Sequence, residues 1–242
     1  MDYVRVIETE GQRIVDLARR GPLEAKVPHI PNWSMQDVVA HLGGVHRWAT
    51  EIVRTLNWEG RRHRKGTETG EALVAWFEEG LGNLVDTFTQ ADPEAKCGNF
   101  SPGSPNVVGF WLRRQAHETS MHRWDVGAAA GVRDPFDPSF ATDGIDEVFH
   151  TFTRSRGKQV LEAPVGIRTD DTGGEWTLSP AEKPGRIDVK VGIDGPVEAT
   201  LRGPAEETLL VLWKRLGLDE ADIEIEGDRS MIERMLTGPV SP

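Results

Sequence analysis

The sequence predicts a two-domain α+β protein, with a helical bundle over residues 1–158 and a small antiparallel α+β domain over 159–242. Two observations support this division. Apolar residues recur at helical spacing through the first two thirds of the chain, and the pattern changes to the alternation typical of β-strands near residue 160. The length of 242 residues is enough for two modest domains with buried cores.

Four helices are predicted for the bundle, at 3–18, 35–56, 71–90 and 107–130. Gly21-Pro22 stops the first helix. Ser34 followed by Asp37 is a capping-box pattern that begins the second helix. The segment 93–105 is rich in Pro, Gly and Ser, so we expect it to be a loop between the third and fourth helices.

A shorter helix near 141–155 leads out of the bundle. Beyond it, period-two alternation and turn residues predict five strands, at 165–171, 175–179, 186–193, 197–203 and 222–227. The segment 172–174, Thr-Gly-Gly, is expected to turn the first two strands into a hairpin. Helices are predicted at 204–217 and 228–238, which gives a mostly antiparallel α+β module.

Composition excludes several classes of function. The net charge of −11 argues against general nucleic-acid binding and against an anionic membrane surface. No apolar run approaches about 18 residues, and the charged N-terminal segment does not resemble a signal peptide, so we expect a cytoplasmic protein. Cys97 is the single cysteine, which excludes a disulfide framework, and we expect an ordinary loop or core thiol.

The stretch "RRQAHETSMHRWD" at 113–125 begins like the His-Glu-x-x-His signature of zinc proteases, but its second histidine comes one residue late. At about 100° per helical residue, His117 and His122 diverge by about 140° and cannot easily bind one ion. Glu118 and His122 are only about 40° out of alignment and can converge on a metal. The spacing therefore argues against a zinc protease and favours Glu118 with His122.

Two interpretations of this helix remain open. Arg114, Glu118, His122 and Asp125 form one stripe, which is either a solvated face with i,i+4 pairs or a polar face turned into the bundle. His41 lies on the apolar stripe of the second helix, where a histidine is either an ordinary core residue or a ligand. If both faces point inward, His41, Glu118 and His122 form a two-histidine, one-carboxylate site with open positions, as in catalytic metal centres.

Two motifs resemble a known family. The segment W-S-x-x-D-x-x-x-H-L runs from Trp33 to Leu42, and H-E-x-x-x-H-R-W-D runs from His117 to Asp125. Together with the α+β tail, they resemble the mycothiol-dependent maleylpyruvate isomerase family over essentially the whole chain. The resemblance implies a DinB-like four-helix bundle and a C-terminal domain similar to sterol carrier proteins.

The resemblance also implies site residues. The zinc ligands of the family correspond to His41, Glu118 and His122. A C-terminal arginine used in activity corresponds to Arg215, for which an exposed arginine near a helix end is the competing interpretation. The remaining predicted site residues are Arg114 and Asp125 in catalysis and Arg47 and Arg123 in cofactor binding, with the four arginines as cations for a diacid. Asp125 or His46 would orient a ligand imidazole, although His46 is also compatible with the surface.

The implied cofactors are Zn²⁺, or another divalent metal, and mycothiol, the small thiol of actinomycetes. Arginine accounts for 21 of the 28 basic residues, which is typical of a GC-rich genome and agrees with an actinobacterial source. The implied partner is a small electrophile: a thiolate adds to the cis double bond of maleylpyruvate, the new single bond rotates, and elimination gives the trans isomer. Mycothiol S-transfer to another electrophile is equally compatible.

Two alternatives come from other classes of function. One is a non-catalytic protein that binds a small molecule or lipid in the α+β domain. The other is a metal-dependent hydrolase that uses the same three ligands to activate water. The sequence does not distinguish a monomer from a dimer.

Overall fold

A computed structural model describes residues 1–242 except 102, 153–160, 183–186 and 238–242. The chain forms two compact units. The first contains Met1–Phe100 and Pro105–Asp134, and the second contains Ser101–Ser104 and Pro135–Pro242. The predicted domain boundary at 158 falls outside the described residues.

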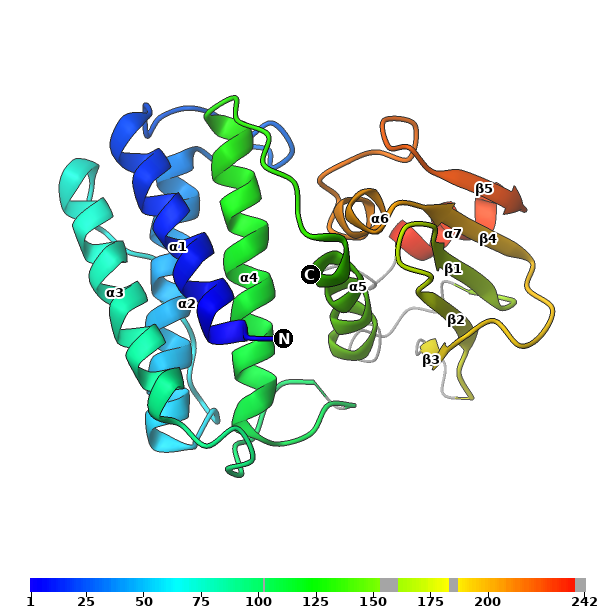
Figure 1. The fold of residues 1–242 in the computed structure, drawn as a ribbon, viewed down its shortest axis with the longest axis horizontal. Helices are drawn as coiled ribbons and strands as arrows, with labels where there is room; N and C mark the ends of the chain where they lie inside the picture. Colours follow the sequence, from blue (N-terminus) through cyan, green and yellow to red (C-terminus); the bar gives the residue numbers. More distant parts are fainter. Residues whose placement is uncertain (102, 153–160, 183–186, 238–242) are drawn as a thin grey trace. The chain divides into compact units, whose positions relative to one another are not determined.

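The first unit is a bundle of four long helices that lie side by side (Figure 1). They are α1 (Tyr3–Arg20), α2 (Met35–Thr55), α3 (Gly70–Gln90) and α4 (Val108–Ala129). Helix α3 packs against α1 and α2, and α4 packs against the same two helices. The predicted four-helix bundle is therefore confirmed.

Helix α2 shows how the sequence specifies these elements. The Ser34 side chain accepts a hydrogen bond from the Asp37 backbone N–H, and the Asp37 carboxylate accepts one from the Ser34 N–H at 2.9 Å, which completes the predicted capping box. Its predicted apolar stripe is buried throughout, from Val38 through Leu42 to Ile52. The buried stripe fixes which side of α2 faces the other helices, and thereby the direction of His41.

Helix α4 differs because much of what it buries is polar. Gln115, Thr119, Ser120, Arg123 and Asp125 are at most 2% exposed. Polar groups are costly to bury unless they have partners, so a helix of this composition requires a network of hydrogen bonds and ion pairs inside the bundle. Within the predicted polar stripe, Arg114 is 4%, His122 5% and Asp125 0% exposed, so the alternative that the stripe is a solvated surface is wrong.

The described residues of the second unit form a five-stranded sheet and three helices. The helices are α5 (Pro138–Thr151), α6 (Ala205–Leu212) and α7 (Arg229–Thr237), and the strands are β1 (Val165–Thr169), β2 (Glu175–Pro180), β3 (Ile187–Val191), β4 (Ala199–Gly203) and β5 (Glu224–Gly227). All five predicted strands are present. Helix α5 packs against α6, and its Asp146 accepts a hydrogen bond from the indole of Trp176 at 3.1 Å. The short helix is thus part of this unit.

The sheet has the order β3-β2-β1-β4-β5. Three of its pairings are antiparallel, as predicted, but β1 and β4 pair in parallel, with Ile167 opposite Leu201. The prediction of a mostly antiparallel module is therefore confirmed, and the sheet contains one parallel pair among its four. Side chains alternate between faces in parallel and antiparallel strands alike, so the pattern does not reveal strand direction.

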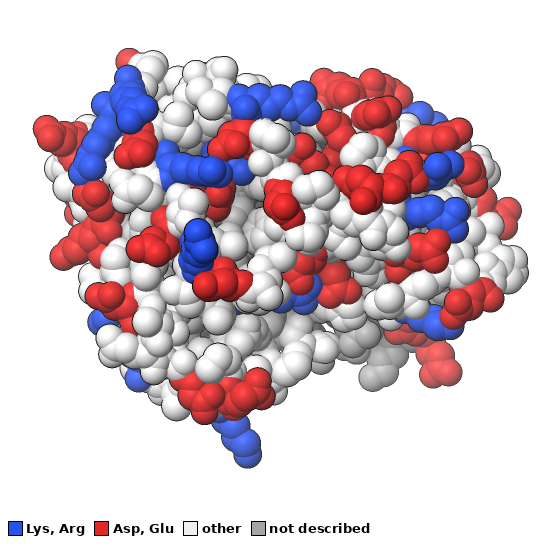
Figure 2. Space-filling view, in the orientation of Figure 1, with Lys and Arg blue, Asp and Glu red and all other residues white. Residues whose placement is uncertain are grey.

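Two smaller expectations concern Cys97 and membranes. Cys97 is 1% exposed, and burial raises the pKa of its thiol, as for an inert core cysteine. Among the described residues, no helix combines the length and the apolar character needed to span a bilayer. Acidic and basic side chains are interspersed on the face seen in Figure 2.

Candidate metal centre

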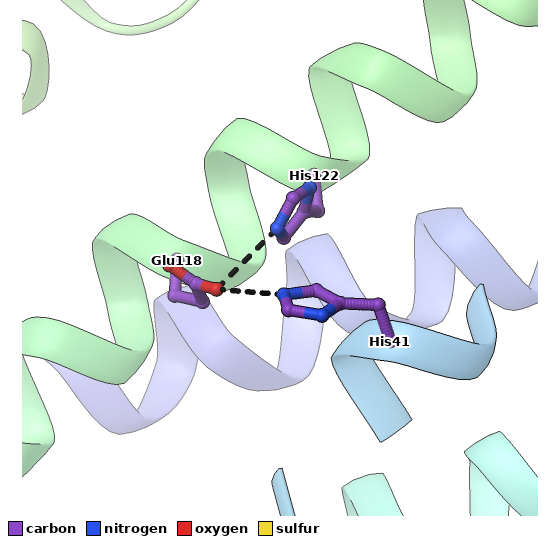
Figure 3. A group of neighbouring side chains, drawn as sticks. All are labelled: His41, Glu118 and His122. Atoms are coloured by element: carbon purple, nitrogen blue, oxygen red, sulfur yellow. Dashed lines mark ion pairs between the residues drawn. The ribbon is translucent and has the colours of Figure 1, made fainter. Parts of the chain in front are cut away.

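Three potential metal ligands meet between α2 and α4 (Figure 3). His41 lies on α2, and Glu118 and His122 lie one turn apart on α4. Glu118 Oε1 lies 3.5 Å from His41 Nε2 and 3.3 Å from His122 Nε2. One ligand atom from each side chain lies within 4.8 Å of the other two, so a single ion can contact all three. We call these residues the ligand cluster.

The spacing along α4 decides which of its histidines joins the ligand cluster. Glu118 and His122 are four residues apart, and both side chains point toward His41 on α2 (Figure 3). The ring of His117 instead packs edge-on against Tyr3 of α1, with 6.3 Å between the ring centroids. The structure therefore shows the divergence of His117 and His122 that the helical angles predict.

Two buried charged residues contact the two α4 ligands and keep them in position. Asp125 is fully buried, and its Oδ2 lies 2.8 Å from Nδ1 of His122, the ring nitrogen that faces away from Glu118. Arg114 is 4% exposed and donates a hydrogen bond of 2.6 Å to Oε2 of Glu118. Each partner contacts the atom that the ligand cluster does not use, so Glu118 Oε1 and His122 Nε2 remain directed at His41.

Burial and neighbouring charges set the protonation of the ligand cluster. Burial lowers the pKa of His122, but Asp125 and Glu118 raise it by more, to about 9. Burial raises the pKa of Glu118, but Arg114 and the two histidines lower it by more, to well below its ordinary value. With no cation bound, His122 is therefore protonated at neutral pH between two carboxylates, and a metal ion would take the place of that proton.

The donor set fits a divalent metal ion. Imidazole nitrogens and carboxylate oxygens are common zinc ligands, and two histidines with one carboxylate leave positions open for water or substrate. The contact between Asp125 and His122 matches the carboxylate partner that metal-bound imidazoles usually have. Iron and nickel accept similar donors, so the chemistry of the site favours a metal of this group without selecting one.

Two aromatic residues beside the ligand cluster were not predicted as site residues. The indole of Trp33 lies 5.1 Å from the ring of His41 and stacks on His122 at 6.3 Å, measured between centroids. The ring of His63 meets His41 edge-on at 5.0 Å. Trp33 is the first residue of the first family motif, and this position is the signal by which the sequence could have indicated it as a site residue. His63 lies in a basic loop, where neither periodicity nor spacing indicates that it approaches His41.

His46 lies deeper in the bundle than expected. It is fully buried, and its Nε2 lies 2.9 Å from Oγ1 of Thr119 on α4. Burial lowers its pKa to about 3, so the imidazole is neutral. A surface position for His46 is therefore wrong, and its hydrogen bond joins α2 to α4 instead of orienting a ligand imidazole.

The predicted arginines separate into different environments. Among the predicted arginines of the first unit, Arg114 contacts the ligand cluster. Arg123 is 2% exposed and bonds Glu10 of α1 at 2.5 Å, on another side of α4. Arg47 lies 3.8 Å above the ring of Trp76 and pairs with Glu79. Arg215 lies in the second unit, where it donates a hydrogen bond to the Trp213 carbonyl.

The fold and the ligand cluster define a class of protein: a helical bundle with a candidate metal centre between facing helices, followed by a small α+β unit. The family model described as the mycothiol maleylpyruvate isomerase N-terminal domain matches residues 4–127, and that of the corresponding C-terminal domain matches 139–234. The chain therefore belongs to the mycothiol-dependent maleylpyruvate isomerase family.

Solved structures show the same fold. The crystal structure of a mycothiol-dependent maleylpyruvate isomerase superposes with a TM-score of 0.61, at 10% identity over 92% of both chains. A histidine-to-alanine mutant of a mycothiol-dependent maleylpyruvate isomerase superposes with a TM-score of 0.63, at the same identity and coverage. A comparison with curated proteins finds none that matches the sequence.

Proposed function

We propose that this protein is a zinc-dependent enzyme that uses mycothiol to attack a small electrophile. Membership of the family supports the use of the thiol, and the convergence of His41, Glu118 and His122 within 4.8 Å is the observation that carries the metal assignment. Zinc held by these three residues would offer an open position to the mycothiol sulfur and lower the pKa of its thiol. Another divalent metal with the same ligand preference would serve the same role.

The residues of the chain keep the donor atoms in position. Asp125 accepts the Nδ1 proton of His122, which leaves the Nε2 lone pair directed at the ligand cluster. Arg114 binds one oxygen of Glu118 and leaves the other for the cation. Trp33 packs beside the two imidazoles, with 5.1 Å to His41 and 6.3 Å to His122 between ring centroids. In this proposal Arg114 and Asp125 act through the ligands and not on the substrate.

Two reactions follow from an attacking thiolate. In cis–trans isomerisation, the thiol is added and eliminated, so it is recovered unchanged. In S-transfer, the thiol remains attached to the product. We propose that the protein performs one of these two, with maleylpyruvate as the first substrate to test because the family is that of its isomerase.

Turnover with and without mycothiol tests this proposal. The zinc-loaded protein is incubated with maleylpyruvate, and NMR follows the loss of the cis double bond while mass spectrometry follows mycothiol adducts. We expect turnover only when mycothiol is present, with either the trans isomer or a mycothiol adduct as the product. Hydrolysis without thiol would overturn the proposal in favour of the hydrolase.

The matched control is His117→Ala. It removes a histidine from the same helix but from the side that faces Tyr3. We expect this variant to keep zinc and thiol-dependent turnover, whereas the ligand variant His122→Ala loses both. Equal activity in the two variants would show that the ligand cluster is not the site of reaction.

A further inference from the structure

A strongly basic loop follows α2. Residues 61–65 read Arg-Arg-His-Arg-Lys, five consecutive residues with basic side chains in a chain whose net charge is −11. The proposed function assigns this run no role. Because like charges repel one another, a concentration of basic groups on a folded acidic protein points to an anionic partner.

The loop is held against α2 by glycines. The Gly66 N–H donates a hydrogen bond of 3.0 Å to the Ala40 carbonyl, one residue before His41. A Cβ atom on Gly44 would lie 2.1 Å from the Arg64 carbonyl oxygen, and one on Gly66 would lie 2.7 Å from the ring of Trp76. Only glycine permits these close approaches. The loop therefore has a defined position on the bundle.

Between the loop, α2 and Trp76 of α3 lies a pocket of about 550 Å³. Arg47 and the whole basic run line it, together with Trp48 and the acidic residues Glu51 and Glu68. The volume is in the range of small-molecule sites. We call this space the basic pocket.

Most of the cations around the basic pocket already have acidic partners. Arg61 pairs with Glu51, Lys65 with Asp37, and Arg47 with Glu79. Arg62 and Arg64 are exposed and make no ion pair or side-chain hydrogen bond to any residue that the structure describes. These two guanidinium groups are the ones available to an external anion.

The basic pocket adjoins the ligand cluster. His63 lines the pocket, and its ring meets that of His41 edge-on at 5.0 Å. A small molecule anchored in the pocket can therefore place its other end near the ligand cluster. Trp48, also in the lining, has a buried indole N–H with no acceptor among the described residues.

We propose that the basic pocket binds the carboxylate end of the electrophile, through Arg62 and Arg64. Guanidinium groups bind carboxylates with paired, charge-assisted hydrogen bonds. In this arrangement the carboxylate of the electrophile binds the loop, and its reactive carbon faces the ligand cluster. The choice of an electrophile as the ligand rests on the proposed function. Of the arginines predicted from the sequence, Arg47 also lines this pocket, where it pairs with Glu79.

Calorimetric titration of the full-length, zinc-loaded protein with succinate tests the pocket, with neutral succinamide as the control ligand. We expect saturable binding of succinate that weakens about tenfold or more in Arg62→Gln/Arg64→Gln, since two charge-assisted contacts are lost. The charge-matched variant Arg5→Gln/Arg20→Gln on α1 should change the affinity less than about twofold, because exposed charges outside the pocket interact weakly. Zinc content is measured for every protein.

Each outcome decides the proposal. No succinate binding, or equal weakening in the two double variants, would overturn it, and tighter binding of inorganic phosphate through the same arginines would overturn the carboxylate assignment. The titration is repeated on His41→Ala/His122→Ala, where we expect succinate still to bind. Binding lost there but kept in the arginine variant would place the anion on the metal. If the wild-type protein failed to take up zinc while its succinate binding still depended on Arg62 and Arg64, the pocket proposal would stand and the metal proposal would be refuted.

Discussion

The interior around α4 and the sheet of the second unit are both buried, but they are built differently. In the sheet, Val165, Ile167, Leu178 and Leu201 are fully buried apolar side chains. Around α4, charged and polar groups are buried in pairs, such as Asp125 with His122. Apolar burial favours folding directly, whereas polar burial only recovers its desolvation cost through partners. The difference separates an apolar region that stabilises the fold from a polar region that holds the candidate metal ligands.

The largest stability effect is expected in the sheet. Leu201→Ala should lower the free energy of unfolding by about 3 kcal/mol, because it leaves a cavity in an apolar core. Chemical denaturation followed by tryptophan fluorescence measures this. Thr200→Ala, on the other face of the same strand, is the control and should cost less than about 1 kcal/mol. Loss of zinc from the Leu201 variant under native conditions would contradict the separation of roles.

Removing Arg114 should cost about 2 kcal/mol in the metal-free protein, because Glu118 would be left without its cation. Glu118 is 15% exposed, so solvent reduces the penalty relative to a fully buried pair. In Arg114→Met the pKa of Glu118 should rise, and added zinc should recover part of the lost stability. Urea denaturation with and without zinc measures both effects, with Arg5→Met at an exposed position of α1 as the control. A destabilisation that zinc leaves unchanged would argue against a cation at Glu118.

Asp125→Asn should weaken zinc binding about tenfold while the fold is kept, since the neutral amide orients His122 less strongly. Competition with a chelator measures the affinity. In the metal-free variant the pKa of His122 should fall below its value of about 9, because Asp125 is among the groups that raise it. An NMR titration follows the imidazole. Unchanged affinity and an unchanged pKa together would remove Asp125 from the site.

The smallest effect is expected where a polar contact lies at the surface of the bundle. Asp37→Asn should cost about 1 kcal/mol through the N-terminal cap of α2. Hydrogen bonds from Lys65 and Ser34 lower the pKa of Asp37 from 3.8 to about 2. Because the folded-state pKa is the lower one, this stability is complete above about pH 4 and disappears as the pH falls toward 2. Denaturation of the wild-type protein and of Asp37→Asn between pH 2 and 6 should show that their difference in free energy of unfolding vanishes at low pH. A difference that stays constant with pH would contradict this role of the Asp37 carboxylate.

Much of the fold could be predicted because its signals are local. The capping box at Ser34, the apolar stripe of α2 and the alternating strands each depend on a few neighbouring residues. The parallel pairing of β1 with β4 could not be predicted, because alternation is the same in both strand directions. The unit to which α5 belongs could not be predicted either, because the apolar side of a helix can cover either a bundle or a sheet.

The candidate site was predictable to the extent that it follows helical geometry. The spacing of Glu118 and His122, and the place of His41 on a buried stripe, bring together the three side chains seen in Figure 3. The arginines were not predictable in this way, because a long cationic side chain binds whichever anion the fold places near it. Arg123 pairs with Glu10, which is 113 positions away in the sequence. The contact of His63 with His41 depends on a loop whose path is set by the close approach at Gly44.

The metal content of the purified protein tests the central claim most directly. We expect about one zinc ion per chain by elemental analysis, as for a single site with three protein ligands. The His41→Ala/His122→Ala variant should lose the ion and remain folded, and His117→Ala should retain it. A double variant that still holds one zinc per chain would contradict the assignment of the ligand cluster.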